Sequence, residues 1–368
     1  MSRPIRVALI SNLCPHYRRP LYEELARRFT LDCFFFAEQE PFWNPLLPAV
    51  EAGDFRHVRM RRMEVLGEPL LPGLASRLSR ARYDAVIVGL VGRLMVPYAY
   101  AVARARHLPF VLWTGTWHHP QTLFHRFSEG CVHGLYRQAD AIVVYGDHVR
   151  RALTAVRGVE GGKIFTAAQA VEGEKFHLPS DPGGSREVLF VGRFEEEKGV
   201  RDLVEAVARI DDPTLRLALV GNGSLEEELR SAATRDARIT VVGHAPQESL
   251  PGLLARARCL VLPSITTPAF REPWGLVVNE AMHAGIPVIA TDAVGAAAHG
   301  LVENMRTGLV VPERDPAALS RAISTLSEGD TLVSTLGSVA HQRVAEYTFP
   351  AMADAFEAAV KCAMARRG

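Results

Sequence analysis

Short runs rich in Val, Ile and Leu alternate with helix-patterned segments along almost the whole chain, and this alternation restricts the fold most strongly. In the first half, "IRVALIS" precedes "PLYEELARRF", and "DAVIVGL" precedes "PYAYAVARAR". In the second half, "EVLFVGR" and "LRLALVG" each precede a helical segment in the same way. Continuous apolar strands separated by helices are typical of a parallel sheet that is covered on both faces. The pattern predicts two doubly wound, Rossmann-like α/β units.

The boundary between the two units is predicted near residues 177–187, where "HLPSDPGGSRE" combines Pro, Ser, Asp and paired Gly before a new first strand. A length of 368 residues fits two domains. We therefore expect an N-terminal domain over 1–178, a C-terminal domain over 179–345 and a final helix over 346–368. Ligands of such units bind at the carboxyl ends of the strands, in a cleft.

Charge and cysteine content exclude several classes of protein. The net charge of +1 gives no reason to expect a nucleic-acid partner. The five cysteines are scattered and never spaced as C-x-x-C, which argues against a disulfide framework or a zinc site and favours a reducing compartment. The chain enters a strand pattern at once and holds no apolar run of about 18 residues. These features predict a soluble, cytoplasmic protein.

The segment "LFVGRFEEEKGV" places two cations just after a strand. Gly192 allows a tight turn, and Arg193 and Lys198 follow it. A diphosphate is the expected ligand, because arginine offers a planar fork and lysine a compact charge. The alternative is a solvated loop in which both cations pair with the neighbouring glutamates. The scarcity of lysine favours the first interpretation; its four positions are Lys163, Lys175, Lys198 and Lys361.

The segment "LALVGNGSLEEEL" carries only part of a dinucleotide-binding motif. It has the first two glycines of G-x-G-x-x-G, but Glu226 stands in the third place. Ser224 and Glu227 have the spacing of a capping box. We therefore expect a glycine turn followed by a capped helix rather than a dinucleotide site.

The segment "REPWGLVVNE" surrounds the predicted start of a helix with two acids. The first free amides of that helix, around Gly275, Leu276 and Val277, would bind a phosphate. Glu280 lies about one and a half turns into the helix, and Glu272 lies in the loop ahead of it. A ligand that places a diphosphate between the two acids and has a hydroxyl-rich group at each end would fit this layout. A nucleotide sugar is such a ligand. Glu280 would accept from the ribose and Glu272 from the sugar ring; exposed acids are the alternative.

At these residues the chain resembles glycosyltransferase family 4, whose members are retaining, metal-independent enzymes of GT-B fold. The resemblance rests on "VGRFEEEKG", "LVGNGSLEEEL", "EPWGLVVNEAMHAGIPVIATDAVG" and "TGLVVPERDPAAL", and it covers nearly all of the C-terminal domain. It implies that Arg193 and Lys198 hold the donor diphosphate, and that the backbone at Gly243 and His244 meets the base. It also implies that the last helix returns to the N-terminal domain.

The N-terminal half departs from the family pattern, and looks like a subgroup. The family usually carries a glycine pair in the first strand–helix loop, which is "SNLCPHYRRPLYEEL" here. Arg18 or Arg19 would then replace backbone amides as the anion ligand, and we name Arg18; two solvated arginines are the alternative. In "PFVLWTGTWHHPQ", His118 is predicted to contact the reacting sugar, with His119 as the other candidate. Gly295 is followed by Ala296 where a second glycine is common.

The sequence thus predicts a hexosyltransferase that moves a sugar from a nucleotide-diphosphate donor to an acceptor hydroxyl with retention. No cofactor is expected, and the lack of any Asp-x-Asp gives no support for a metal. The acceptor stays open between a small molecule, a glycan and a lipid-linked compound. A sugar phosphorylase, a nucleotide-sugar epimerase and a non-catalytic binding protein remain alternatives. The arginine-rich segments "RHVRMRR" and "RLSRARY" fit either weak peripheral membrane contact or solvated faces.

Overall fold

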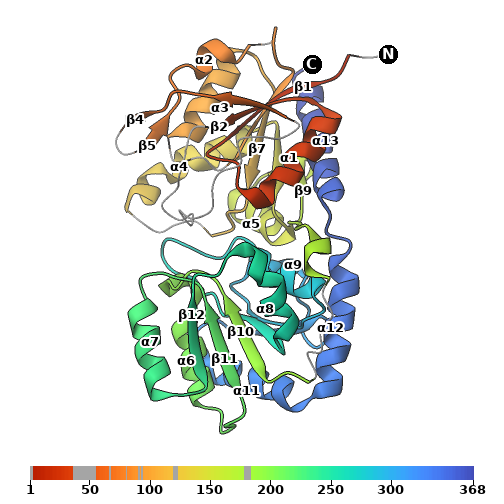
Figure 1. Ribbon diagram of the computed structural model, residues 1–368. Helices are drawn as coiled ribbons and strands as arrows, with labels where there is room; N and C mark the ends of the chain where they lie inside the picture. The colour runs from red at the N-terminus through yellow and green to blue at the C-terminus, as the bar shows by residue number, and fades with distance from the viewer. Residues whose placement is uncertain are drawn as a thin grey trace. The chain divides into compact units, whose positions relative to one another are not determined.

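The chain forms two α/β units (Figure 1). The structure is a computed structural model that describes residues 3–35, 55–65, 68–79, 81–89, 92, 94–118, 123–177 and 184–368. The first unit comprises the described residues up to 115 together with 123–169 and 348–368. The second unit comprises those within 116–122 and 170–347. The chain thus passes into the second unit at residue 170, ahead of the expected boundary.

The first unit is built on a parallel sheet with the strand order β3-β2-β1-β6-β7-β8-β9. Every strand pair in this sheet is parallel, as the continuous apolar runs predict. The order reverses between β1 and β6, which lie side by side at the switch point of the sheet. The strands are β1 (Arg6–Ser11), β2 (Thr30–Phe35), β3 (Arg56–Arg59), β6 (Ala85–Val88), β7 (Phe110–Thr114), β8 (Ala141–Val144) and β9 (Ile164–Thr166), beside the hairpin β4 (Met63–Val65) and β5 (Glu68–Leu70).

Helices cover this sheet, and the last helix of the chain is one of them. The helix α13 (Phe349–Ala365) packs on α1 and β8, and Arg28 of α1 donates to Asp354 of α13 at 2.5 Å. Helix α2 is short and ends after one turn. The other helices are η1 (His16–Arg18), α1 (Arg19–Arg28), α2 (Leu74–Arg77), α3 (Met95–Ala105), α4 (Leu123–Gln138), α5 (Asp147–Arg157) and η2 (Gly161–Lys163).

The second unit repeats this architecture with a six-stranded parallel sheet in the order β12-β11-β10-β13-β14-β15. Its switch point lies between β10 and β13. The strands are β10 (Glu187–Val191), β11 (Arg216–Val220), β12 (Ile239–Gly243), β13 (Cys259–Leu262), β14 (Val288–Thr291) and β15 (Gly308–Val311). The helices are η3 (Gly173–Phe176), η4 (Glu196–Lys198), α6 (Val200–Ala208), α7 (Glu226–Arg235), η5 (Gln247–Ser249), α8 (Leu250–Arg256), α9 (Leu276–His283), α10 (Gly295–His299), α11 (Pro316–Glu328) and α12 (Asp330–Val344).

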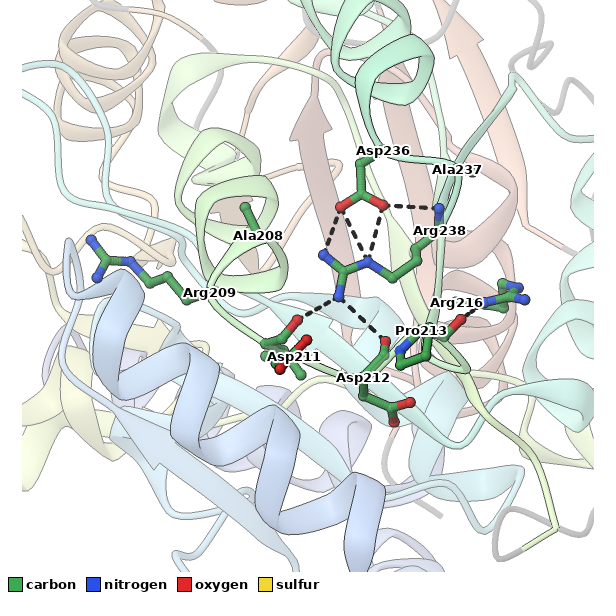
Figure 2. A pocket seen from close by; sticks show the side chains of 10 residues that line it. Ala208, Arg209, Asp211, Asp212, Pro213, Arg216, Asp236, Ala237 and Arg238 are labelled. Atoms are coloured by element: carbon green, nitrogen blue, oxygen red, sulfur yellow. Dashed lines mark hydrogen bonds and ion pairs between the residues drawn. The ribbon is translucent and has the colours of Figure 1, made fainter.

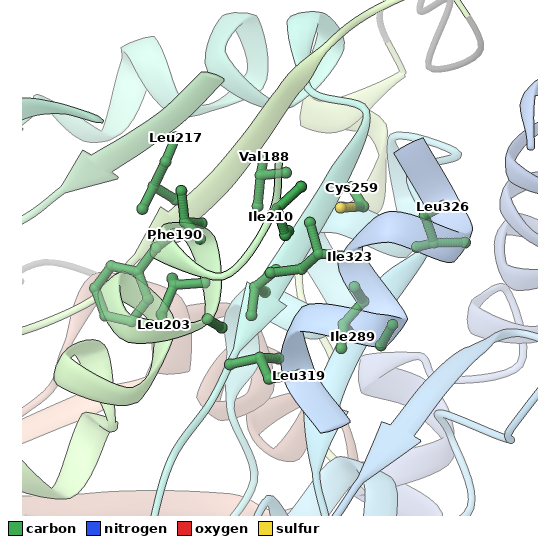
Figure 3. Close-up of a cluster of buried hydrophobic side chains, with 14 of the residues drawn as sticks. Val188, Phe190, Leu203, Ile210, Leu217, Cys259, Ile289, Leu319, Ile323 and Leu326 are labelled. Carbon is green, nitrogen blue, oxygen red and sulfur yellow. The ribbon is translucent and has the colours of Figure 1, made fainter. Parts of the chain in front are cut away.

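One face of the second sheet meets α6 and α11 in a continuous apolar core (Figure 3). Val188 and Phe190 lie two residues apart on β10 and therefore point to the same face. Leu203 of α6 and Ile323 of α11 are fully buried in the same cluster. Each such side chain contributes about 1.5–3 kcal/mol through the loss of water contact. This core fixes β10, and with it the loop that follows β10.

Candidate functional site

The predicted C-terminal site residues gather at the switch point of the second sheet. Arg193 and Lys198 follow β10, and Glu272 follows β13. Because β10 and β13 are parallel neighbours, both loops leave from the same edge of the sheet. This is the position at which open α/β sheets bind ligands. The structure therefore brings together residues that lie more than 70 positions apart in the sequence.

An ion pair between Lys198 and Glu272 forms the centre of this site. The Lys198 ammonium donates to the Glu272 carboxylate, and the Ser264 hydroxyl donates to the same oxygen at 3.2 Å. Glu272 is only 6% exposed, and the Lys198 side chain is largely buried. The Phe270 ring lies beside the ammonium, with its centroid 5.3 Å away. The interpretation of Lys198 as part of a solvated loop pairing with adjacent glutamates is therefore wrong.

A close backbone approach sets the position of Lys198. Gly199 has a φ of +64°, and a Cβ at this residue would lie 1.9 Å from the Pro263 carbonyl oxygen. The amide of Ile265 donates to the Glu197 carbonyl at 2.9 Å, which ties the loop after β13 to the loop after β10. Only glycine accommodates both the left-handed backbone and the contact. Lys198 is thus held against the Glu272 loop by the main chain.

The neighbouring Arg193 has a local partner. Its guanidinium donates to Glu197 at 2.6 Å, and its side chain is 37% exposed. For Arg193, the alternative interpretation, in which the cation pairs with a neighbouring glutamate of its own loop, is therefore correct. A half-exposed guanidinium in a local pair keeps donors for a further anion, because arginine offers five N–H groups.

The predicted capping box at the glycine turn is wrong. Helix α7 begins at Glu226 after Leu225, and the Ser224 hydroxyl instead donates to Glu195 at 2.6 Å. The Ser224 amide donates to the same carboxylate at 3.0 Å. Ser224 thus connects the glycine turn to the loop after β10, which capping spacing alone does not reveal.

Helix α9 begins where the sequence predicts. Gly275 is its N-cap with a φ of +91°, and a Cβ there would lie 2.5 Å from Leu262 Cδ2. The buried Trp274 indole donates to Asn279 at 2.7 Å and fixes the first turn. Leu276 and Val277 open the helix and are half-buried. Their amides lie among the first N–H groups of the helix, which have no partner within it.

Glu280 lies further along the same helix in an environment that favours its neutral form. Burial raises the pKa of the Glu280 carboxyl to about 7, and no other cause contributes. The group therefore titrates near neutral pH.

Trp117, Gly295 and Ala296 hold the Glu272 loop in place. The Glu272 carbonyl accepts from the Gly295 amide at 3.1 Å and from the Trp117 indole at 3.0 Å. The Arg271 guanidinium stacks on Trp117 at 3.7 Å from its ring centroid. The Trp274 carbonyl accepts from the amide of Ala296, the residue that replaces the common second glycine, at 2.9 Å.

Two further predicted residues lie at the end of β12. Gly243 has a φ of +78°, and its carbonyl accepts from the Gly221 amide at 2.8 Å. His244 follows and is exposed. Both residues lie at the same edge of the sheet as Lys198, because β12 runs parallel to the other strands.

His118 and Arg18, the predicted site residues of the N-terminal half, belong to different units. His118 is half-buried and belongs to the second unit with the other described residues of 116–118. His119 lies outside the described residues. Arg18 belongs to the first unit and is 8% exposed, whereas Arg19 pairs with Glu23 at 2.6 Å on the surface.

A surface hollow of about 540 Å³ lies at the opposite edge of the second sheet (Figure 2). It is lined by Arg216 and Arg238, which stand at the amino ends of β11 and β12. The Arg238 guanidinium is engaged by Asp236 at 2.7 Å and by carbonyl oxygens, so its charge is already matched. The hollow is distinct from the site at the carboxyl edge.

Residues 185–329 match the family model described as Glycosyl transferases group 1. This range holds Arg193, Lys198, Glu272 and Glu280. The matched range contains the site at the β10/β13 switch point.

Curated relatives match part of the chain. The glycogen synthase of Mycobacterium tuberculosis strain H37Rv is 29% identical over 217 residues, which are 57% of this chain and 51% of that protein. The lipopolysaccharide core biosynthesis glycosyltransferase LpsE of Rhizobium meliloti is 30% identical over 191 residues, which are 51% of this chain and 52% of that protein. The chain spans about half the length of these relatives.

Solved structures match the whole fold. HepE of Anabaena in complex with UDP-glucose has a TM-score of 0.73 and 17% identity, over 95% of this chain and 97% of that one. The predicted GT-B class, with two Rossmann-like units, is confirmed at the level of fold. No helix in the described residues combines the length and apolar character needed to cross a membrane.

Proposed function

We propose that the protein is a retaining, metal-independent glycosyltransferase, which the match of residues 185–329 to the model described as Glycosyl transferases group 1 supports. It would move a hexose from a nucleotide-diphosphate sugar to an acceptor hydroxyl. One observation carries the proposal: at the β10/β13 switch point, Lys198 pairs with Glu272 next to Arg193, in the unit whose helix α9 opens at Gly275.

The donor diphosphate would lie against the two cations and the start of α9. The amides of Gly275, Leu276 and Val277 supply N–H donors that the helix does not use. Lys198 has three donors, of which Glu272 takes one, so the ammonium can bridge the carboxylate and a phosphate. A Cβ at Gly192, beside Arg193, would lie only 3.2 Å from Phe190 Cζ.

Each end of the donor would meet a carboxylate. Glu272 would accept from the hydroxyls of the transferred sugar, since its fixed carbonyl holds the loop in place. Glu280 would accept from the ribose. The base would lie along the backbone at Gly243 and His244. These roles leave Glu272 as a ligand of the sugar hydroxyls rather than as a nucleophile.

In the transfer step, the bond between the anomeric carbon and the leaving phosphate oxygen breaks, and the acceptor oxygen bonds to that carbon on the same face. The acceptor proton passes to the leaving phosphate oxygen. Arg193, Lys198 and the helix amides stabilise the charge that develops on the diphosphate, an effect of preorganised groups. His118 would contact the reacting sugar. No cofactor takes part in this scheme.

The names of similar proteins support a choice of donor and acceptor. HepE holds UDP-glucose in its solved structure, so UDP-hexoses are the first donors to test. LpsE is named for lipopolysaccharide core biosynthesis, which favours a glycan or lipid-linked acceptor. Weak peripheral contact with an anionic membrane would suit a lipid-linked acceptor.

The free thiols of Cys14 and Cys33 suit a reducing compartment, so we place the activity in the cytoplasm.

A panel of nucleotide sugars tests this function. The donor should raise the Tm in proportion to its affinity. Without an acceptor, nucleoside diphosphate should be released only slowly, by hydrolysis of the donor; an acceptor should increase the rate of release. NMR should show that the product keeps the anomeric configuration of the donor. The rate of sugar transfer should not fall in the presence of excess chelator. A phosphate requirement would instead indicate a phosphorylase, donor isomerisation an epimerase, and binding without turnover a non-catalytic protein. Inversion, or loss of rate in chelator, would contradict the mechanism.

A further inference from the structure

A tryptophan from a distant part of the sequence holds the main chain at Glu272. Trp117 belongs to the second unit together with the other described residues of 116–118. Its indole N–H donates to the Glu272 carbonyl oxygen at 3.0 Å, and the Gly295 amide donates to the same oxygen at 3.1 Å. A main-chain carbonyl has two lone pairs, and both are used here. The two bonds therefore fix the direction of the peptide group that follows Glu272.

The residue before Glu272 packs on the same tryptophan. The Arg271 guanidinium carbon lies 3.7 Å from the Trp117 ring centroid, and an Arg271 N–H donates to the Asp292 carbonyl oxygen at 3.2 Å. Burial lowers the pKa of the Arg271 guanidinium, whereas the nearby Glu313 and Asp292 raise it. A cation over an aromatic ring gains more when it is desolvated in this way. Trp117 thus holds the chain through both the Arg271 side chain and the Glu272 carbonyl.

These contacts bear on the Glu272 carboxylate, because a functional side chain is held in a precise orientation only when its surroundings fix it. The carboxylate accepts from the Lys198 ammonium and from the Ser264 hydroxyl. A shift of the Glu272 main chain would move the carboxylate relative to both donors. In an active site, a displacement of about 1 Å can lower the rate by a factor of about 100. The orientation of the Glu272 carboxylate therefore depends on Trp117.

The start of the loop after β13 has attachments of its own. The Ile265 amide donates to the Glu197 carbonyl at 2.9 Å, and the Thr266 hydroxyl donates to the Glu313 carboxylate at 2.7 Å. These bonds do not involve Trp117, which acts at the other end of the loop, on the acid that would meet the ligand. The contacts of Trp117 are thus placed to orient that acid, while other residues attach the loop.

We propose that Trp117, with Arg271 stacked on its ring, is a positioning residue that orients the Glu272 carboxylate toward the sugar of the donor. The inference rests on the proposed function, which supplies the sugar as the ligand of Glu272. Trp117 acts through Glu272 and makes no contact with the donor in this scheme. Its loss should therefore disturb recognition of the sugar more than recognition of the nucleoside diphosphate.

A first experiment tests the positioning without any ligand. The coupling between Lys198 and Glu272 is measured by urea unfolding of Lys198→Met, Glu272→Gln and the double variant, both in the wild type and in Trp117→Phe. Phenylalanine keeps a ring for Arg271 and removes the indole N–H. If Trp117 aligns the carboxylate, the coupling should be smaller in the Trp117→Phe background. An equal coupling in both backgrounds would overturn the inference.

A second experiment compares UDP with UDP-glucose by isothermal titration of the full-length protein. In Trp117→Phe, the affinity for UDP should stay within about twofold, whereas the affinity for UDP-glucose should fall about tenfold, the upper range for one hydrogen bond. Arg271→Gln keeps the indole N–H, and it should show the same selective loss if Trp117→Phe does not fold. The control Thr266→Val removes the hydroxyl bond to Glu313 in the same loop. It should lower the Tm and leave both affinities unchanged.

Equal losses of affinity for UDP and UDP-glucose, or no loss for either, would overturn the role toward the sugar and leave Trp117 as a structural contact. Failure of the proposed function has a different signature. A wild-type protein that binds neither UDP nor UDP-glucose would contradict the proposed donor. The coupling measured without ligand would then decide whether Trp117 positions Glu272.

Discussion

The Lys198 ammonium and the Glu272 carboxylate form a largely buried ion pair across the switch point of the second sheet. The two residues are 74 positions apart, and the close approach of Gly199 to Pro263 holds their loops together. Removal of either residue would leave the other as a buried, unpaired charge, which destabilises the folded protein. The pair is therefore both a structural contact and the part of the proposed site that a ligand would meet.

A double-mutant cycle should show this dependence in stability. We expect Lys198→Met and Glu272→Gln each to lower the free energy of unfolding by about 3 kcal/mol. The double variant should lose about 1–3 kcal/mol less than the sum, because neither charge is then left alone. Urea unfolding measures all three. The exposed pair of Lys361 and Glu357 is the control, with an expected coupling of about 0.5 kcal/mol. Additive effects at Lys198 and Glu272 would show that they are independent.

Turnover should depend on Lys198 beyond any effect on folding. If the ammonium stabilises the leaving diphosphate, Lys198→Ala should lower kcat by about 10²–10³ at saturating donor. The matched control Lys361→Ala removes an exposed lysine of α13 and should leave kcat unchanged. Steady-state assays on folded protein, checked by Tm, separate the two effects. A Lys198→Ala enzyme with wild-type kcat would refute the role in leaving-group stabilisation.

The parallel sheets and the start of α9 could be predicted from sequence because their signals are local. The apolar runs at β10 and β13 give the strands, and Gly275 followed by an apolar helix gives the cap. Strand order follows once both halves are recognised as doubly wound, which places the loops after β10 and β13 at one edge. The part of the candidate site that depends on sheet topology could therefore be predicted from the sequence.

The contacts that fasten the site could not be predicted, because they join segments far apart in the chain. The bond from the Trp117 indole to the Glu272 carbonyl spans 155 positions. The same holds for the capping error at Ser224, whose spacing is correct but whose hydroxyl meets Glu195 instead. Local spacing permits several partners, and tertiary packing selects one of them.

Donor affinity should rise with pH because of Glu280. Burial raises the pKa of this carboxyl to about 7, and a ribose with two hydroxyl donors favours the ionised form. Binding should therefore release a proton below pH 7 and strengthen between pH 6 and 8. Calorimetry with a nucleotide-diphosphate sugar, whose diphosphate does not titrate in this range, measures both effects. The Glu280→Gln variant should bind more weakly and without this pH dependence; an unchanged profile would remove Glu280 from the ribose site.

Arg258 should be required for the stability of the second unit. Its side chain is fully buried, and it donates to the Leu326 carbonyl, to the Ser185 carbonyl at 3.0 Å and to Asp330 at 2.7 Å. Arg258→Met should lower the free energy of unfolding by about 3 kcal/mol or more, because buried carbonyls lose their partners. Arg258→Lys should not restore it, since one ammonium cannot reach all three acceptors. Chemical denaturation of both variants measures this, and full rescue by lysine would contradict the geometric argument.

Acid should destabilise the second unit through a cluster of three histidines. His283 of α9 lies 5.9 Å from His177 and 6.4 Å from His341 between ring centroids, and its carbonyl is 2.8 Å from His341 Nδ1. Burial first, and then the two neighbouring imidazoles, lower the pKa of His283 to about 4. The unfolded chain binds this proton near pH 6.5 and the folded one only near pH 4, so stability falls as the pH drops between these values. Thermal unfolding across this range should show a shallower loss in His283→Gln than in the wild type or in His133→Gln, a control on α4 in the other unit. Equal slopes in all three proteins would assign the acid sensitivity to other groups.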